Sequence, residues 1–197
     1  HAVKVKGLTP GKQYRYRVFA QEVLKHTGYK IIYGSYASTD VYYRKPLTFH
    51  TCNPQAPATS FVMVNDIHGD NKLLEDLMSR CNLTQTDFVL FNGDMLSFIN
   101  SEDQLFKGFM DTAVRLFASE IPMYYARGNH ETRGVFATEI QRYFSPCQEH
   151  LYYAFRQGPV YCIVLDTGED KPDSDIEYAG ITQYDLYRTE QSEWLAS

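Results

Sequence analysis

Phe61-Val62-Met63-Val64-Asn65-Asp66-Ile67-His68 is the stretch that decides the fold, because four apolar residues lead into an acidic residue and a histidine. Two later apolar runs end in a similar way, residues 88–91 before Gly93-Asp94 and residues 121–125 before Gly128-Asn129-His130-Glu131. Short apolar runs are typical of buried parallel strands, and α/β sheets bind ligands at the carboxyl ends of such strands. The sequence therefore predicts an α/β fold that gathers oxygen and imidazole groups at one edge, as a metal site needs.

The segments that follow these strands predict helices and a hairpin. Residues 71–80 and 104–118 carry apolar stripes with helical spacing, and further helices are expected at 138–143 and 183–196. Residues 152–155 and 160–165 predict a hairpin that turns at Gln157-Gly158-Pro159. The alternation of strand, loop and helix indicates a layered α/β domain.

The N-terminal region is β-rich by pattern, with candidate strands at residues 3–5, 14–19, 29–33 and 47–51. Residues 8–18 resemble the fibronectin type III pattern, in which a leucine, a Pro-Gly turn and a tyrosine corner lead into a strand. The resemblance implies about half of an all-β sandwich, with its opening strands expected before His1. The predicted organisation is a partial fibronectin type III-like domain at 1–52, a proline-bearing linker at 53–60 and an α/β domain at 61–197.

Composition excludes several classes of protein. With 197 residues and a net charge of −5, the chain does not favour a nucleic-acid surface that neutralises phosphates. No apolar run is long enough for a membrane span, and no signal peptide opens the chain. The four cysteines form no C-x-x-C pair, so core thiols are favoured over zinc ligands or two disulfides, and Cys162 is expected to be buried.

The residues that end the three strands suit metal binding. Asp66 and His68 lie two positions apart, so on an extended strand end their side chains would point the same way. A carboxylate with an imidazole suits iron, manganese or zinc. A glycine lets the backbone turn before Asp94, a carboxylate on the central strand that is placed to bridge two metals. Asn129 offers a neutral amide oxygen, and His130 is expected to project to another side and face a substrate.

Together, Asp66-Ile67-His68, Gly93-Asp94 and Gly128-Asn129-His130-Glu131 resemble the first three blocks of the calcineurin-like metallophosphoesterase superfamily. The N-terminal segment resembles that of the purple acid phosphatase branch. The resemblance implies a β-sandwich flanked by helices, of which this chain holds the first half, and hydrolysis of phosphate esters by a dinuclear metal-activated hydroxide. Carried over by residue, it implies one metal on Asp66 and His68, a bridging Asp94, a second metal on Asn129, and a catalytic His130.

Four neighbouring residues are candidates for contacts to the ligands or to phosphate: Asp70, Arg127, Glu131 and Arg133. Asp70 could orient an imidazole, but N-capping the helix that follows is an equal alternative. The two arginines could meet phosphate oxygens, although a solvated arginine is the more common case.

The chain also departs from the family pattern. The purple acid phosphatase branch has a tyrosine where Ser97 stands and a glycine where His68 stands, so its charge-transfer colour is not expected. The family needs a further histidine block and a Gly-His-x-His, but the only later histidine is His150, which is expected at the surface. The sequence therefore resembles a fragment cut at both ends, expected to be inactive and to bind at most one metal weakly.

Alternative interpretations stay open at this stage. A non-catalytic binding or adhesion module with a vestigial phosphoesterase fold is the main rival, whereas a structural zinc site lacks convergent ligands. A phosphorylated small molecule or macromolecule is the expected substrate, with monoester or diester undecided. Export to the periplasm, cell surface or exterior is expected, because fibronectin-like fusions to this fold are usually exported.

Overall fold

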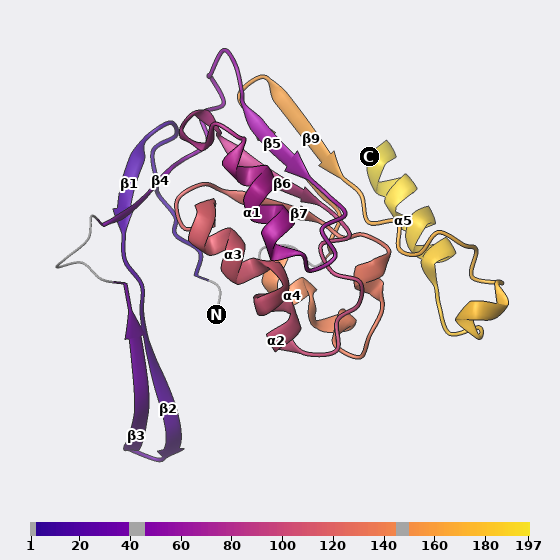
Figure 1. The fold of residues 1–197 in the computed structure, drawn as a ribbon, viewed down its shortest axis with the longest axis horizontal. Helices are drawn as coiled ribbons and strands as arrows, with labels where there is room; N and C mark the ends of the chain where they lie inside the picture. The colour runs from indigo at the N-terminus through magenta and orange to yellow at the C-terminus, as the bar shows by residue number, and fades with distance from the viewer. Residues whose placement is uncertain (1–2, 40–45, 145–149) are drawn as a thin grey trace.

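The computed structural model describes residues 3–39, 46–144 and 150–197, with a three-stranded parallel sheet at its centre (Figure 1). Its strands lie in the order β5 (Phe61–Val64), β6 (Phe88–Asn92) and β7 (Met123–Ala126). Both neighbouring pairs are parallel. The three apolar runs are therefore adjacent strands whose carboxyl ends share one edge, which confirms the predicted α/β arrangement.

Helices cover one face of this sheet. Residues of alternating parity point to opposite sides of a strand, and Phe91 and Tyr125 face the helices, where both rings lie beside that of Phe109. The covering elements are α1 (Asn71–Ser79), α4 (Gln141–Phe144) and a continuous helical stretch with two π-helical parts, namely α2 (Glu102–Leu105), η2 (Phe106–Met110), α3 (Asp111–Ala113) and η3 (Val114–Ala118). This helical face of the sheet holds the main hydrophobic core.

A β-hairpin covers the opposite face. β8 (Tyr153–Gln157) and β9 (Val160–Val164) pair antiparallel, as predicted. Phe155 stacks on Tyr124 with ring centroids 3.6 Å apart and meets Phe88 edge-on at 5.3 Å. The central sheet thus lies between helices and a second sheet, which is the sandwich that the sequence predicts.

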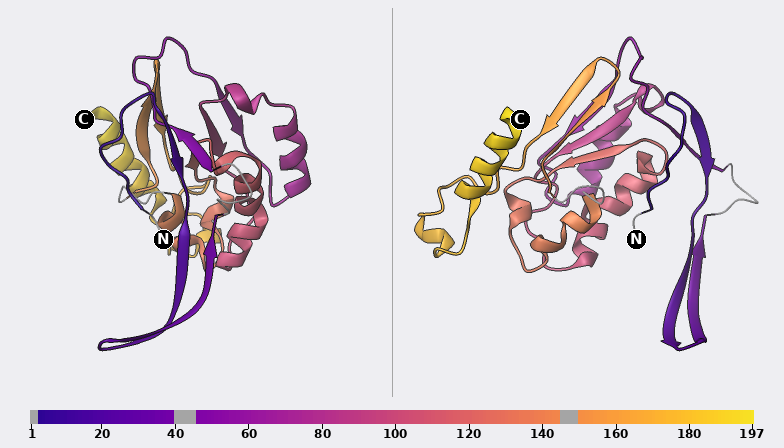
Figure 2. Two further views of the ribbon diagram at one scale, coloured as in Figure 1. Left: turned by 90° about the vertical axis from the view of Figure 1, so that its left-hand side faces the viewer. Right: turned by 180° about the vertical axis from the view of Figure 1, so that it is seen from behind.

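The remaining helices of the described chain are α5 (Tyr184–Ala196) and four 3₁₀ turns: η1 (Leu83–Gln85), η4 (His130–Thr132), η5 (Ala137–Glu139) and η6 (Ile176–Tyr178). α5 lies beyond β9 at the yellow end of the chain (Figure 2). Its Trp194 packs on Tyr152 with ring centroids 5.1 Å apart. Among the described residues, no helix combines the length and apolar character needed to cross a membrane.

The N-terminal region forms two antiparallel pairs. β1 (Gln13–Tyr16) pairs with β4 (Leu47–His50), and β2 (Phe19–Thr27) pairs with β3 (Lys30–Ser38). The Tyr14 hydroxyl accepts the Thr9 N–H at 2.7 Å, a contact expected of a tyrosine corner. Figure 2 shows the β2–β3 hairpin projecting away from the rest of the molecule.

Several N-terminal predictions need correction. Residues 3–5 are described but form no strand, because no partner strand lies beside them. The strand predicted at 14–19 ends at Tyr16, and β2 was not predicted at all. β3 extends well past the predicted 29–33 because β2 pairs along its length.

The cysteines follow the prediction in part. Cys52, Cys81 and Cys162 are free thiols, and Cys147 lies outside the described residues. Cys162 is half-buried rather than fully buried, because β9 pairs only with β8 within the described chain. No zinc ligand set is expected from such separated thiols.

Candidate metal centre

The backbone after β5 turns sharply to present its two polar residues. Asp66 and His68 have φ of 57° and 52°, the left-handed region, so the expectation of an extended strand end was wrong. Hydrogen bonds to the β6 loop hold this turn, from Asp66 N to Gly93 O at 3.2 Å and from His68 N to Asp94 O at 3.0 Å. The side chains still meet, with His68 Nε2 3.7 Å from Asp66 Oδ1. Left-handed residues of this kind gather at functional sites.

Two glycines bring the second and third motifs together. Gly93 has a φ of +83°, and a Cβ there would lie 2.7 Å from the Gly128 Cα. A Cβ on Gly128 would lie 2.1 Å from Asp94 Oδ1. Side chains at either position would therefore push the two loops apart. The predicted tight turn at Gly93 is confirmed. Because Gly93 has no side chain, the backbone of the third motif at Gly128 can lie directly against it.

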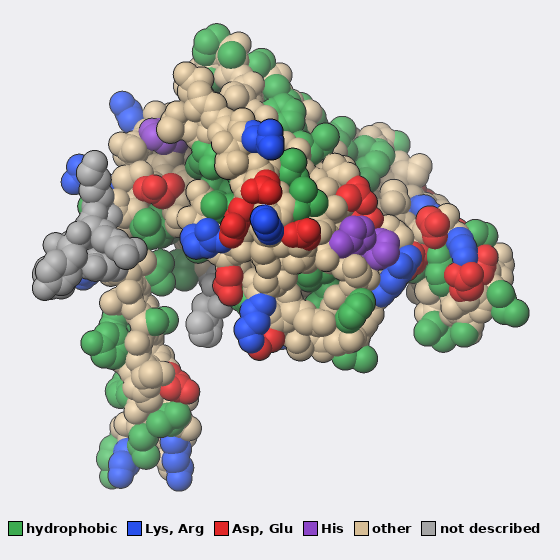
Figure 3. Space-filling view, in the orientation of Figure 1, with side chains coloured by type: hydrophobic (Ala, Val, Ile, Leu, Met, Phe, Trp, Pro, Cys, Tyr) green, Lys and Arg blue, Asp and Glu red, His purple; other side chains and the backbone are tan. Residues whose placement is uncertain are grey.

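Three side chains from the three loops converge. One ligand atom each of His68, Asp94 and His130 lies within 4.8 Å of the others, which makes these three a candidate metal-binding group among the described residues. The two imidazole rings meet edge-on with centroids 4.7 Å apart, so His130 lies beside His68 at the same site. His68 is exposed and His130 is half-buried. Figure 3 shows purple histidine side chains at the molecular surface.

Ser97 lies between the two imidazoles. Its hydroxyl is 3.1 Å from His68 Nδ1, and its carbonyl oxygen is 3.2 Å from His130 Nδ1. Both rings are thus held through Nδ1, and Nε2 of His68 faces Asp66 Oδ1. Sequence comparison marked Ser97 only as a departure from the family, because these contacts depend on the turn of the chain.

Glu131 is a fully buried carboxylate beneath the site. It accepts the backbone N–H groups of Leu96 at 2.8 Å, Asp94 at 3.0 Å and Gly128 at 3.0 Å. Burial raises the pKa of its carboxyl group, and the three hydrogen bonds oppose that rise. Glu131 therefore ties the β6 loop to the β7 loop from inside the protein.

Arg133 and Asn129 both contact a residue that sequence reasoning missed. Glu169 accepts from Arg133 Nε at 2.6 Å and Nη2 at 2.9 Å, and from Asn129 Nδ2 at 3.3 Å. Arg133 is therefore paired within the protein, and its Nη1 lies 3.2 Å from His130 Nδ1. Glu169 could have been predicted, because it follows the apolar run at 160–165 just as the acidic residues of the other three loops follow their strands.

Asp70 and Arg127 also have partners inside the protein. Asp70 N-caps α1 by accepting the Leu73 N–H at 2.9 Å, which favours the capping alternative. Arg127 donates from Nε to Asp166 Oδ1 at 3.0 Å, and its Nη2 lies 2.9 Å from Asp166 Oδ2. A solvated arginine is therefore wrong for Arg127, which is mostly buried against a fully buried carboxylate.

Comparison with known proteins agrees with this geometry. Residues 59–197 match the sequence model of the calcineurin-like phosphoesterases. The chain belongs to this family. A purple acid phosphatase from yellow lupin (Lupinus luteus) seeds has a similar structure, with a TM-score of 0.57 and 17% identity over 90% of this chain. The chain spans 34% of that phosphatase, and no curated protein sequence gives a match.

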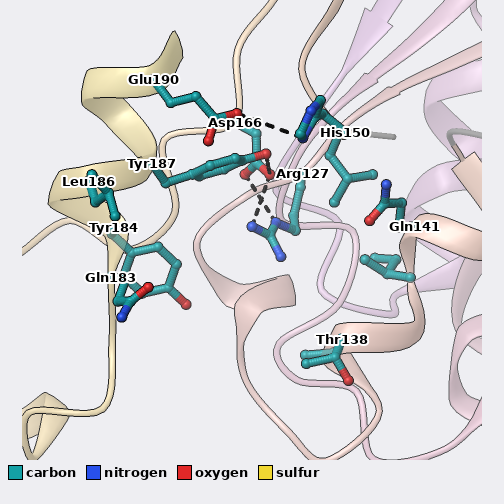
Figure 4. Close-up of a pocket in the computed structure, with 13 residues that line it drawn as sticks. Arg127, Thr138, Gln141, His150, Asp166, Gln183, Tyr184, Leu186, Tyr187 and Glu190 are labelled. Carbon is teal, nitrogen blue, oxygen red and sulfur yellow. Dashed lines mark hydrogen bonds and ion pairs between the residues drawn. The ribbon is translucent and has the colours of Figure 1, made fainter. Parts of the chain in front are cut away.

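The calcineurin-like phosphoesterase domain has two cavities relevant to the site. One of about 330 Å³ borders His68 and is lined by His68, Leu96, Ser97, Phe98, Gln104, Lys107 and Gly108. The other, of about 400 Å³, lies between α5 and η5. Figure 4 shows Arg127 and Tyr187 converging on Asp166 in that second cavity, with His150 facing Glu190. His150 stays partly exposed, as predicted, and it does not join the three-residue cluster.

Proposed function

We propose that this chain carries part of the active site of a metal-dependent hydrolase of phosphate esters. The observation that supports this is the convergence of His68, Asp94 and His130 in a chain of the calcineurin-like phosphoesterase family. The proposed ligands Asp66, His68, Asp94 and Asn129 offer oxygen atoms and one imidazole. Such a mixed set fits iron, manganese or zinc, whereas magnesium and calcium prefer oxygen alone. The donor set therefore fits the cofactor that the family implies.

The proposed ligands divide between two cations. Asp66 and His68 would hold one, Asn129 the other, and Asp94 would bridge both. When bound, such a pair supplies positive charge for the phosphoryl oxygens and lowers the pKa of a water molecule. The chain itself contributes rigidity, because Glu131 and the backbone bonds from Asp66 and His68 fix the loops on which these ligands lie.

His130 is proposed to act on the substrate. Its backbone N–H donates to Asp94 Oδ1 at 3.2 Å, and Ser97 O holds its Nδ1. Nε2 can then face the phosphate and give a proton to the leaving oxygen, a role usually worth about 10²–10⁴-fold in rate. Arg133 lies beside the same ring and is 42% exposed, whereas Arg127 is mostly buried against Asp166. Arg133 is therefore the better placed of the two arginines to meet phosphate.

Metal binding offers the clearest test of this proposal. Three proposed ligands for one cation and two for the other predict weak binding and little turnover by the 197-residue chain. We expect Mn²⁺ titration, followed by calorimetry or electron paramagnetic resonance, to show one weak site. Asp94→Asn should weaken it at least about tenfold, because a charged ligand is lost.

Asp103→Asn is the matched control, since Asp103 is an exposed carboxylate paired with Lys107 on the helical face. Equal Mn²⁺ affinity in the wild type and Asp94→Asn would refute the proposed ligand set. Fast hydrolysis of p-nitrophenyl phosphate by the chain alone would contradict the expected weak site. A diester such as bis(p-nitrophenyl) phosphate, tested alongside, addresses the open choice between monoester and diester.

A further inference from the structure

We infer that Glu169 is a positioning residue that fixes the side-chain amide of Asn129 with its oxygen turned toward the metal centre. The inference rests on the proposed function, in which Asn129 is a metal ligand. Glu169 lies about 40 positions after Asn129 in the chain, on the segment that follows β9. It therefore brings a fourth chain segment to the site.

The contacts of Glu169 make it a fixed acceptor. Its side chain is 8% exposed, and Arg133 and Asn129 on the β7 loop donate to it. Arg133 gives two hydrogen bonds, and the Thr132 hydroxyl lies 3.1 Å from Oε1. Asn129 Nδ2 lies 3.3 Å from Oε2. Arg133 meets both carboxylate oxygens of Glu169 in a two-point ion pair, so both oxygens serve as hydrogen-bond acceptors.

A carboxylate held in such an ion pair imposes an orientation on a neighbouring amide. It has only acceptor oxygens, so it can face the NH₂ group of Asn129 but not the carbonyl oxygen. The two groups lie on opposite branches of the amide, and only the oxygen can bind a metal. Without Glu169, the amide would be free to present its nitrogen to the cation. Partners that orient ligands in this way typically contribute about 10- to 100-fold to metal affinity.

The Thr132 hydroxyl supports the same arrangement from the backbone. It donates toward the Asn129 carbonyl oxygen at 2.7 Å while lying beside Glu169. The main chain and the side chain of Asn129 are thus both tied to one cluster. Within the described part of the chain, no hydrogen-bond donor engages the side-chain amide oxygen of Asn129, so this atom is left for a metal.

One experiment reads the amide directly and needs no metal. In ¹⁵N-labelled protein, the hydrogen-bonded NH₂ proton of Asn129 should resonate downfield and exchange slowly in the wild type. Glu169→Gln should lose that shift, because a glutamine can present either its oxygen or its own NH₂. An unchanged Asn129 signal in Glu169→Gln would overturn the inference. Glu139→Gln, which removes an exposed carboxylate paired with Arg142, is the control.

A double-mutant cycle with Mn²⁺ separates positioning from general stability. At Mn²⁺ concentrations high enough to fill the cation position held by Asn129 and Asp94, Glu169→Gln should weaken binding at that position about 10- to 100-fold in the wild-type background. It should have no further effect in Asn129→Ala. An equal loss in both backgrounds would show a merely structural role and overturn the inference. If Asn129→Ala alone leaves binding unchanged, the proposed ligand set fails, while the NMR signal still decides whether Glu169 orients the amide.

Glu169→Asp covers the case in which Glu169→Gln does not fold. It keeps the charge for Arg133 but withdraws the carboxylate by one methylene, so Asn129 should lose its hydrogen bond while the ion pair remains. We expect an intermediate loss of Mn²⁺ affinity and the same change in the NH₂ signal. A wild-type signal with wild-type affinity in Glu169→Asp would count against the inference.

Discussion

The central parallel sheet and the β2–β3 hairpin use similar residues but differ in what covers them. β6 lies between helices on one face and β8–β9 on the other, and Phe88, Val89 and Phe91 are almost completely buried. In β2 all nine residues are exposed. Burial therefore depends on neighbouring layers and not on the strand itself, because a lone two-stranded hairpin offers no core to enter.

The same difference decides where chemistry can be placed. The loops after β5, β6 and β7 are anchored by a buried carboxylate and by loop-to-loop backbone bonds, which hold polar groups in fixed positions. The β2–β3 hairpin carries an exposed carboxylate of its own, Glu22, whose partner is Ser35 across the pair. That contact, like the bond from Gln21 Nε2 to Ser35 O at 3.2 Å, joins only the two strands of the hairpin. A site needs the rigid rim of the covered sheet.

The largest effect is expected from removing one phenylalanine in each region. Phe91→Ala should cost about 3–5 kcal/mol in the free energy of unfolding, because it empties a core position packed against Phe109 and Phe117. Phe19→Ala should cost under about 1.5 kcal/mol, since Phe19 is 64% exposed and stacks only on Tyr36 among the described rings. Urea unfolding followed by circular dichroism measures both. Similar losses in the two variants would mean that the hairpin has a core of its own.

The covered sheet was predictable from sequence, whereas the hairpin was not. Residues 88–91 form a short apolar run because both faces of the central strand β6 are covered. The run at 61–64 in the neighbouring strand β5 shows the same pattern, although Phe61 and Met63 are exposed. β2 was missed because Gln21, Glu22 and Lys25 interrupt any apolar pattern, as exposure allows. An exposed strand needs no apolar pattern, so its sequence gives little indication that a strand is there.

The candidate site was also predictable only in part. Motif order at strand ends was enough to predict that Asp66, Asp94 and Asn129 lie on neighbouring loops. The partners Ser97 and Glu169 were not predicted, because their contacts arise from turns and from a segment distant in sequence. The reason given for Asp66 and His68 also failed, since their proximity comes from left-handed backbone and not from an extended strand. Sequence spacing indicates which loops meet, but hydrogen bonds set how they meet.

Alanine substitution of one glycine in each region tests how much room the backbone of that region has. Gly93→Ala should destabilise the protein by about 1–3 kcal/mol more than Gly28→Ala, because the new Cβ would lie 2.7 Å from the Gly128 Cα. Gly28, in the turn of the hairpin, has a φ of +56° and nothing within 4 Å, so it shows only the strain of a left-handed alanine, about 1–2 kcal/mol. Thermal unfolding measures both. Equal decreases in melting temperature would mean that the β7 loop moves aside freely. The loops after the central strands would then not be rigid.

The smallest effect concerns a tyrosine that joins the β8–β9 hairpin to the central sheet. The Tyr153 hydroxyl donates to Tyr125 O at 2.9 Å and accepts Tyr125 N–H at 3.1 Å, so Tyr153→Phe should cost about 1 kcal/mol at pH 8. Burial raises the pKa of Tyr153 to about 12, against 10 for a free tyrosine. A raised pKa means that the folded state keeps its proton longer than the unfolded state. The stability that this group contributes is therefore complete below pH 10 and is lost as the pH rises toward 12.

The pH dependence separates this contribution from the other tyrosines of the chain. Between pH 8 and pH 11.5, the wild type should lose more stability than Tyr153→Phe, and the gap between the two variants should narrow, because every other tyrosine is shared and cancels in the difference. Tyr36→Phe is the hairpin counterpart, since Tyr36 is 70% exposed and should match the wild type at both pH values within about 0.5 kcal/mol. Urea unfolding at each pH gives the three curves. A constant gap between the wild type and Tyr153→Phe would mean that the phenol ionises equally easily in the folded and unfolded states. The β8–β9 layer would then fail to shield the central sheet from water at this point, and the distinction between covered and uncovered strands would lose its support on this face.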